Sequence, residues 1–209
     1  MKTDDLIATL SADAPPQQGG AGGVWLVPAL VLPALGLFAT LGVRADLAEV
    51  LTQPMVAVKT VVPLVVALVA VLWGLRLARP GAAAGPWPSV LAVMPAPVVM
   101  AVVAALMLTA SDTWPMQWTG KTIWWCLAII PLMAVLPLGA ALLLMRQAAP
   151  TRPALTGAVL GLAAGGIATA AYSLHCIEDS PLFYASWYST AILIVVAAGG
   201  LIGSRALRW

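Results

Sequence analysis

Six runs of mostly apolar residues recur along the chain, and they constrain its fold more than any other feature. The runs are Val24–Val43, Val56–Leu75, Val90–Thr109, Ile123–Met145, Ala154–Leu174 and Tyr184–Gly203. A helix needs about 20 such residues to cross the hydrocarbon core of a bilayer. Strands of a membrane barrel would instead alternate in polarity over about ten residues. The pattern predicts an all-α polytopic membrane protein: a six-helix transmembrane bundle over residues 24–209, preceded by a polar segment, residues 1–23.

The composition excludes several classes of soluble protein. Hydrophobic residues make up 62% of the 209 residues and charged residues only 9%, whereas ordinary soluble domains are about 25% charged. Ten Lys and Arg residues and eight Asp and Glu residues are too few to cover a water-facing globule of this size. A soluble enzyme, a nucleic-acid-binding protein with a basic face and a disordered tail are therefore excluded, and the lipid bilayer is the expected surrounding.

The basic residues between the runs predict the orientation. One alternating set of loops, taken with both termini, carries seven of them: Lys2, Arg76, Arg79, Arg146, Arg152, Arg205 and Arg208. The opposite set carries Arg44, Lys59 and Lys121. Because basic residues mark the cytoplasmic side, we expect both termini in the cytoplasm. The N-terminus lacks the basic region of a signal peptide, so the first run is expected to be retained in a bacterial inner membrane.

The apolar runs carry packing signals and no ionisable residue near their middle. Glycines one turn apart, in Gly157-x3-Gly161-x3-Gly165 and Gly199-x3-Gly203, predict close contact between helices of this chain. Prolines inside several runs predict bends in those helices. Ion pumps and proton-coupled carriers place ionisable groups at depth, so such a transporter is disfavoured. A channel or carrier for an uncharged solute remains an alternative, and we expect no catalytic residue and no small-molecule substrate.

Two cysteines are expected at the outer face of the membrane. Cys126 lies about one turn into the fourth run, and Cys176 follows His175 in the outer loop between the fifth and sixth runs. In an oxidising periplasm two thiols can form a disulfide, bind a soft metal ion such as copper, or be unrelated core residues. His175 and Met116 are further candidate ligands for such an ion, and no cofactor is expected to be obligatory. With a single pair and no CxxC motif, a periplasm-facing thiol oxidoreductase is the least favoured alternative.

The N-terminal segment predicts a short amphipathic helix. A threonine cap and two acidic residues suit the positive first turn of a helix, three apolar residues follow on one face, and a Pro-Pro pair ends it. Such a segment on a glycine-rich tether is suited to fold on binding to a partner protein; the alternatives are a frayed tail and a helix that lies on the lipid surface, although acidic residues disfavour the latter. The candidate partner-binding residues are Thr3, Asp4, Asp5, Leu6, Ile7, Leu10, Asp13, Pro15 and Pro16.

Three features together resemble the NrsF family of six-span bacterial anti-sigma factors. They are the opening Met1-Lys2-Thr3-Asp4-Asp5-Leu6-Ile7 with the stretch Leu10-Ser11-Ala12-Asp13-Ala14-Pro15-Pro16, the six apolar runs, and the motif His175-Cys176-x-Glu178-Asp179-Ser180-Pro181-x-Phe183, which ends near Trp187-Tyr188. The resemblance covers essentially the whole chain, and the cysteine-loop motif is its most specific part. It implies a protein that is not an enzyme and that holds an extracytoplasmic-function (ECF) sigma factor at the inner membrane.

The resemblance also implies roles for particular residues. Cys126 and Cys176 correspond to the two periplasmic cysteines that the family needs for its signal response, and the N-terminal segment corresponds to the part that holds the sigma factor. The implied sequence of events is release of the sigma factor when periplasmic metal or oxidative stress alters the two cysteines.

Overall fold

The computed structural model describes residues 3–12, 26–50, 52–79, 85–148 and 150–208, and the regular elements in these ranges are helices. They are α1 (Thr3–Ala12), α2 (Leu26–Leu41), α3 (Leu47–Val50), α4 (Pro54–Leu77), α5 (Trp87–Val93), α6 (Ala96–Leu108), α7 (Trp114–Thr119), α8 (Ile123–Met145), α9 (Pro153–Ser173) and α10 (Pro181–Ala206), with short 3-10 turns at Ser111–Thr113 and Arg146–Ala148. The all-helical class predicted from the sequence is confirmed. The predicted boundary at residue 23 lies outside the described residues.

Five helical segments in these ranges are long and apolar enough to cross a membrane. They are Val56–Leu77, Trp87–Leu108, Ser111–Ala148, Pro153–Ser173 and Pro181–Ala206. Each contains one of the predicted apolar runs nearly whole, and α8 reproduces the predicted Ile123–Met145 without a shift. The first predicted run holds the shorter α2, which has 16 residues.

Proline divides the third apolar run into two helices. α5 ends at Val93 and α6 begins at Ala96, with Met94 and Pro95 between them. Proline has no backbone N–H and its ring clashes with the preceding turn, so it breaks or bends a helix. In α4 and α8, by contrast, Pro63 and Pro131 stay inside a continuous helix. Pro95 thus coincides with a break between two helices, whereas Pro63 and Pro131 do not.

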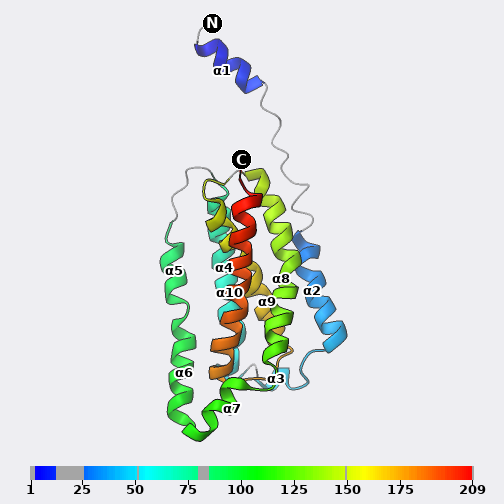
Figure 1. Cartoon of the computed structure of the whole chain (residues 1–209), viewed down its shortest axis with the longest axis vertical. Coiled ribbons are helices and arrows are strands. Elements are labelled where there is room, and N and C mark those ends of the chain that lie inside the picture. The colour runs from blue at the N-terminus through cyan, green and yellow to red at the C-terminus, as the bar shows by residue number, and fades with distance from the viewer. Residues whose placement is uncertain (1–2, 13–25, 51, 80–84, 149, 209) are drawn as a thin grey trace.

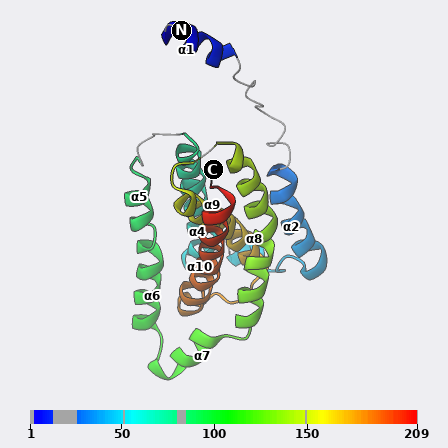
Figure 2. The ribbon, with the colours of Figure 1, turned by 45° about the horizontal axis from the view of Figure 1, so that its top comes forward.

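Helix α9 forms the centre of the bundle. It packs against α4, α8 and α10, and Figure 2 shows these helices between α5 and α6 on one side and α2 on the other. Gly157 of α9 lies against Gly199 of α10 so closely that a Cβ at either position would collide with the backbone of the other helix. At Gly166, a Cβ would lie 2.7 Å from the carbonyl oxygen of Pro63 in α4. The predicted close contact of small residues within the chain is confirmed.

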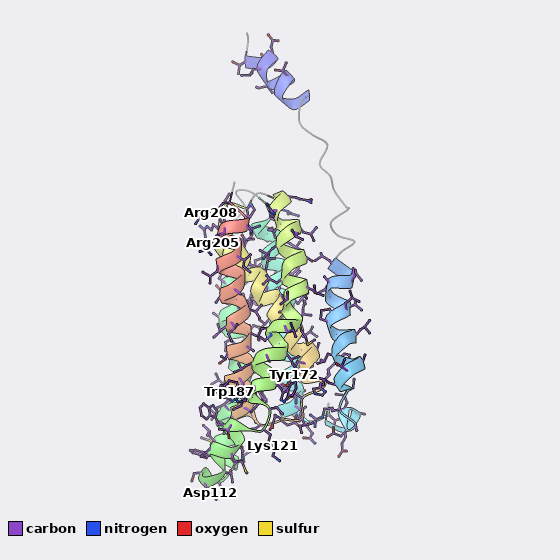
Figure 3. All side chains as sticks on the ribbon, turned by 45° about the vertical axis from the view of Figure 1, so that its right-hand side comes forward. Asp112, Lys121, Tyr172, Trp187, Arg205 and Arg208 are labelled. Atoms are coloured by element: carbon purple, nitrogen blue, oxygen red, sulfur yellow. The ribbon has the colours of Figure 1, made fainter. Side chains whose placement is uncertain are left out.

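The two ends of the bundle differ in their residues. Helices α3 and α7 lie at one end, and the C-terminus lies at the other (Figure 1). Figure 3 places Arg205 and Arg208 near the C-terminal end, whereas Asp112, Lys121 and Trp187 lie towards α7. We call the end that holds α3 and α7 the α7 end.

Candidate functional site

The two predicted thiols meet at the α7 end of the bundle. Cys126 lies in the first turn of α8, and Cys176 lies just beyond the end of α9. Both are free cysteines and both are buried, with 0% and 2% of their surface exposed. The Cys126 thiol donates a hydrogen bond to the Tyr172 hydroxyl of α9 at 3.4 Å. Packing of α8 on α9 therefore brings together two residues that the sequence placed only on the same face of the membrane.

Polar groups surround the sulfur of Cys176. The Thr122 hydroxyl lies 3.9 Å from Cys176 Sγ. The neighbouring Cys126 side chain lowers the pKa of the Cys176 thiol below its usual range; burial opposes this effect, and the Tyr188 hydroxyl, the Glu178 backbone and the charge of Lys59 support it. Hydrogen bonds to the charged form and a nearby cation both favour a thiolate. Cys176 is thus the more easily ionised member of the pair.

A buried lysine holds the loop that carries Cys176. Lys59 lies in α4 with 1% of its surface exposed. Its ammonium donates to the carbonyl oxygens of Cys176 at 2.8 Å and Glu178 at 3.2 Å, and to Asp179 Oδ1 at 2.5 Å. All three acceptors belong to the connection between α9 and α10. A buried ammonium is costly unless it is paired and hydrogen-bonded, and this loop supplies both kinds of partner.

Arg44, which follows α2, joins the same network. Its guanidinium contacts both carboxylate oxygens of Asp179, at 2.8 and 2.9 Å, and both oxygens of Asp46, at 2.7 and 2.9 Å. It also donates to the carbonyl oxygen of Cys176 at 3.3 Å. Burial raises the pKa of Asp179, but the hydrogen bonds from Arg44 and Lys59 outweigh it and hold that pKa below its usual value. Asp179 is therefore a carboxylate shared by two cations.

Further contacts fasten the cysteine loop to its neighbours. His175 Nδ1 lies 2.9 Å from the carbonyl oxygen of Gly42, and the Lys121 backbone N–H donates to Glu178 Oε1 at 2.7 Å. In α10, the Trp187 indole N–H donates to the carbonyl oxygen of Trp118 in α7 at 2.8 Å. The loop is thus connected to the segments that follow α2 and α7, and α10 is connected to α7.

The predicted metal ligands are only partly gathered. Cys126, Cys176 and His175 lie around the same loop, whereas Met116 is an exposed residue of α7. Within the described ranges, no group of three or more His, Cys, Asp and Glu residues is arranged to hold a metal ion. The chemistry that the geometry favours is that of two adjacent thiols, and the soft-metal site stays a prediction.

The predicted N-terminal helix is present as α1. Asp4 and Asp5 occupy its first turn, and the helix begins at Thr3 itself, the residue expected to cap it. Leu6 and Ile7 are 43% and 59% exposed. The Leu10 side chain and residues Asp13, Pro15 and Pro16 lie outside what the structure describes. Two of the three predicted apolar contact residues are therefore seen exposed on a formed helix.

Sequence reasoning missed the charged part of this site. It treated Lys59 and Arg44 as loop cations that report orientation, and it gave Tyr172 no role. One signal was available: Lys59 lies inside an apolar run, where a lysine is costly unless it finds a partner. That partner, Asp179, lies 120 positions away in the sequence. Only the folded structure identifies it.

Comparison with known proteins places the whole chain among regulators. The family model for the negative regulator of sigma F, NrsF, matches residues 9–209. The chain is 36% identical to the probable anti-sigma-F factor NrsF of Azospira oryzae over 218 aligned residues, which cover 100% of both chains. It is 34% identical to the anti-sigma-F factor NrsF of Caulobacter vibrioides over 230 aligned residues, again covering 100% of both. No solved structure matches the chain.

Proposed function

Because the chain belongs to the NrsF family of negative regulators of sigma F, we propose that it is an anti-sigma factor that holds an ECF sigma factor at the bacterial inner membrane. The observation that carries this proposal is the end-to-end match to two anti-sigma-F factors. The family is one of regulators, and the role proposed here is regulatory, with no catalytic step.

In the proposed topology all six apolar runs cross the membrane and both termini lie in the cytoplasm. The charges at the two ends of the bundle support this orientation. Arg205 and Arg208 lie at the C-terminal end (Figure 3), whereas the carboxylates of Asp46 and Asp179 neutralise Arg44 at the α7 end. Unpaired basic residues are retained on the cytoplasmic side. Helix α2 alone extends about 24 Å, so residues that flank it must complete the first crossing.

The proposed contact with the sigma factor begins at α1. Its exposed Leu6 and Ile7 offer an apolar face to a groove of the partner. Burial of one such side chain contributes about 1.5–3 kcal/mol, and ordering a tethered segment costs about 2–5 kcal/mol. Two or three apolar residues therefore bind weakly by themselves. The cytoplasmic loops around Arg79 and Arg152 are the proposed second contact.

The proposed signal is a change in the state of Cys126 and Cys176, made by metal or oxidative stress in the periplasm. A disulfide or a bridging ion between them would pull the first turn of α8 towards the loop after α9. Helices α8 and α9 run the length of the bundle from this pair to the opposite end (Figure 1). A displacement of this kind alters the partner-binding face only if the helices can pack in two arrangements of similar energy. The oxidised or metal-bound pair must also favour one of these arrangements over the other.

Membrane fractionation tests the sequestration step. Cells that carry the wild-type chain should hold the cognate sigma factor in the membrane fraction, and Leu6→Asp with Ile7→Asp should move it to the soluble fraction. Thr9→Ser is the matched control, because Thr9 is also exposed on α1 but its hydroxyl donates back to Asp5 O within the helix. A soluble sigma factor beside the wild-type chain would refute the proposal. Normal retention by the double variant would refute only the role of α1.

A further inference from the structure

A cavity of about 270 Å³ opens beside the thiol pair, between the end of α2, the start of α8 and the loop after α9. Its walls include Leu41, Ile129 and Ile177, with the ring of Trp125 at its side. Thr122 and Cys176 also line it. It is close to the lower limit for small-molecule pockets, which begin at about 300 Å³. A cysteine thus forms part of the wall of a small, mainly apolar cavity.

The two thiols differ in their access to this cavity. Cys176 lines it, whereas Cys126 is not part of the wall and is fully buried. Cys126 instead donates its hydrogen bond to Tyr172, which also lines the cavity. A molecule that enters therefore meets Cys176 first, and Cys126 can react only with a group already attached to Cys176.

The wall also selects the kind of molecule that enters. Lys59 and Arg44 are neutralised by Asp179 and Asp46 in the adjacent network, and none of these four residues lines the cavity. Apart from Cys176 and the ring of His175 the wall is mainly apolar, so a hydrated anion would lose its water there without meeting a lysine or an arginine. An uncharged molecule with an apolar body loses little hydration free energy when it enters such a site. The reactive group of the wall is a thiol, so the matching reagent is an electrophile that oxidises sulfur.

We infer that this cavity admits an organic hydroperoxide to Cys176, and that Cys126 then resolves the oxidised sulfur as a disulfide. This inference rests on the proposed function and names the chemical class that would act on its sensing thiols. It assigns different roles to the two cysteines: Cys176 attacks and Cys126 resolves.

The chemistry balances in two steps. Cys176 sulfur attacks the terminal oxygen of the hydroperoxide, the O–O bond breaks, and the thiol proton leaves with the alkoxide as an alcohol, so that Cys176 becomes a sulfenic acid. The Thr122 hydroxyl, 3.9 Å from Cys176 Sγ, is placed to donate to the departing oxygen. Cys126 sulfur then attacks Cys176, and the hydroxyl group leaves as water with the Cys126 proton. Two thiols lose two electrons, and one hydroperoxide gains them.

Peptide mapping of the purified full-length protein in lipid nanodiscs tests the order of reaction. Limiting cumene hydroperoxide is added with dimedone, which traps sulfenic acids. Cys126→Ser should accumulate the adduct on Cys176, whereas Cys176→Ser should leave Cys126 unmodified. The wild-type protein should yield a Cys126–Cys176 disulfide, and any adduct that dimedone traps should be on Cys176. This measurement does not depend on whether a variant folds. An adduct on Cys126 in the wild type or in Cys176→Ser would overturn the inference. No oxidation of the wild type would overturn it as well.

A comparison of a large and a small oxidant tests whether the hydroperoxide reaches Cys176 through the cavity. Ile177→Trp should narrow the cavity and slow oxidation by cumene hydroperoxide severalfold, with a much smaller effect on hydrogen peroxide. Leu132→Trp is the matched control, because Leu132 is exposed on α8 and lies outside the cavity wall. If Ile177→Trp slowed oxidation by both oxidants equally, or slowed neither reaction, entry through this cavity would be refuted. None of these measurements uses a sigma factor, so failure here and failure of sequestration in cells are separate results.

Discussion

The ammonium of Lys59 in α4 lies 2.5 Å from Oδ1 of Asp179, and this partly buried contact joins α4, one of the helices long and apolar enough to cross a membrane, to the loop that carries Cys176. Arg44 contacts the same carboxylate at 2.8 Å. A carboxylate shared by two cations fixes the position of Cys176 relative to α4 and to the end of α2. The position of the reactive loop is therefore set by charge as well as by apolar packing.

Asp179→Asn should destabilise the protein because it leaves the buried charge of Lys59 without its partner. Breaking a buried pair costs about 3–5 kcal/mol, and since Asp179 is partly exposed we expect the lower value of about 2–3 kcal/mol. The measurement is unfolding of the purified protein in detergent. Asp112→Asn, an exposed aspartate at the same end of the bundle, is the control. Equal stability of the two variants would show that the network contributes little.

The lowered pKa of Asp179 predicts how the stability of the protein depends on pH. The pKa of Asp179 is lower in the folded protein than the ordinary value of 3.8 for this side chain. Its contribution is therefore fully present above that value and is lost as the pH falls through the folded pKa. The stability difference between wild type and Asp179→Asn should be constant near neutral pH and should shrink as the pH falls below about 4. A difference that grows under acid would contradict this assignment.

Gly157→Ala should separate α9 from α10. A Cβ at this position would collide with the Gly199 carbonyl, and overpacking of this kind costs about 1–3 kcal/mol. Gly165→Ala is the matched control on the same helix, since its Cβ would meet its nearest neighbour at an ordinary 3.4 Å. The unfolding temperature of each variant checks the difference. Because Gly→Ala by itself raises helix propensity, comparable losses in both variants would show that the closer contact at Gly157 is not what sets the cost.

Cys126→Ser and Cys176→Ser should each abolish induction of the sigma-dependent promoter by metal or oxidant, because either substitution removes the pair. Basal repression should persist, since α1 and the loops proposed to be cytoplasmic are unchanged. A promoter reporter in cells that carry each variant measures both. Full induction in either variant would exclude the pair as the sensor. Loss of basal repression in both would instead indicate that the thiols are needed for folding.

Local sequence determined the helices themselves. Long apolar runs cannot leave backbone polar groups unpaired in lipid, so they must be helical, and for α8 the predicted boundaries were those observed. Proline at position 95 divided the third run, and the spacing of Gly157 and Gly161 predicted a close helix contact. Each of these features depends on residues a few positions apart, which is why the sequence alone was sufficient.

The tertiary structure decided which distant residues meet. Only the packing of α8 on α9 placed Cys126 beside Cys176, and only the fold gave Lys59 its partner 120 positions away. From sequence, Lys59 counted as a loop cation. It is instead buried within α4, because Asp179 and two loop carbonyls satisfy its charge. Pairings of this kind depend on how the helices are arranged around α9, and no local pattern of residues specifies that arrangement.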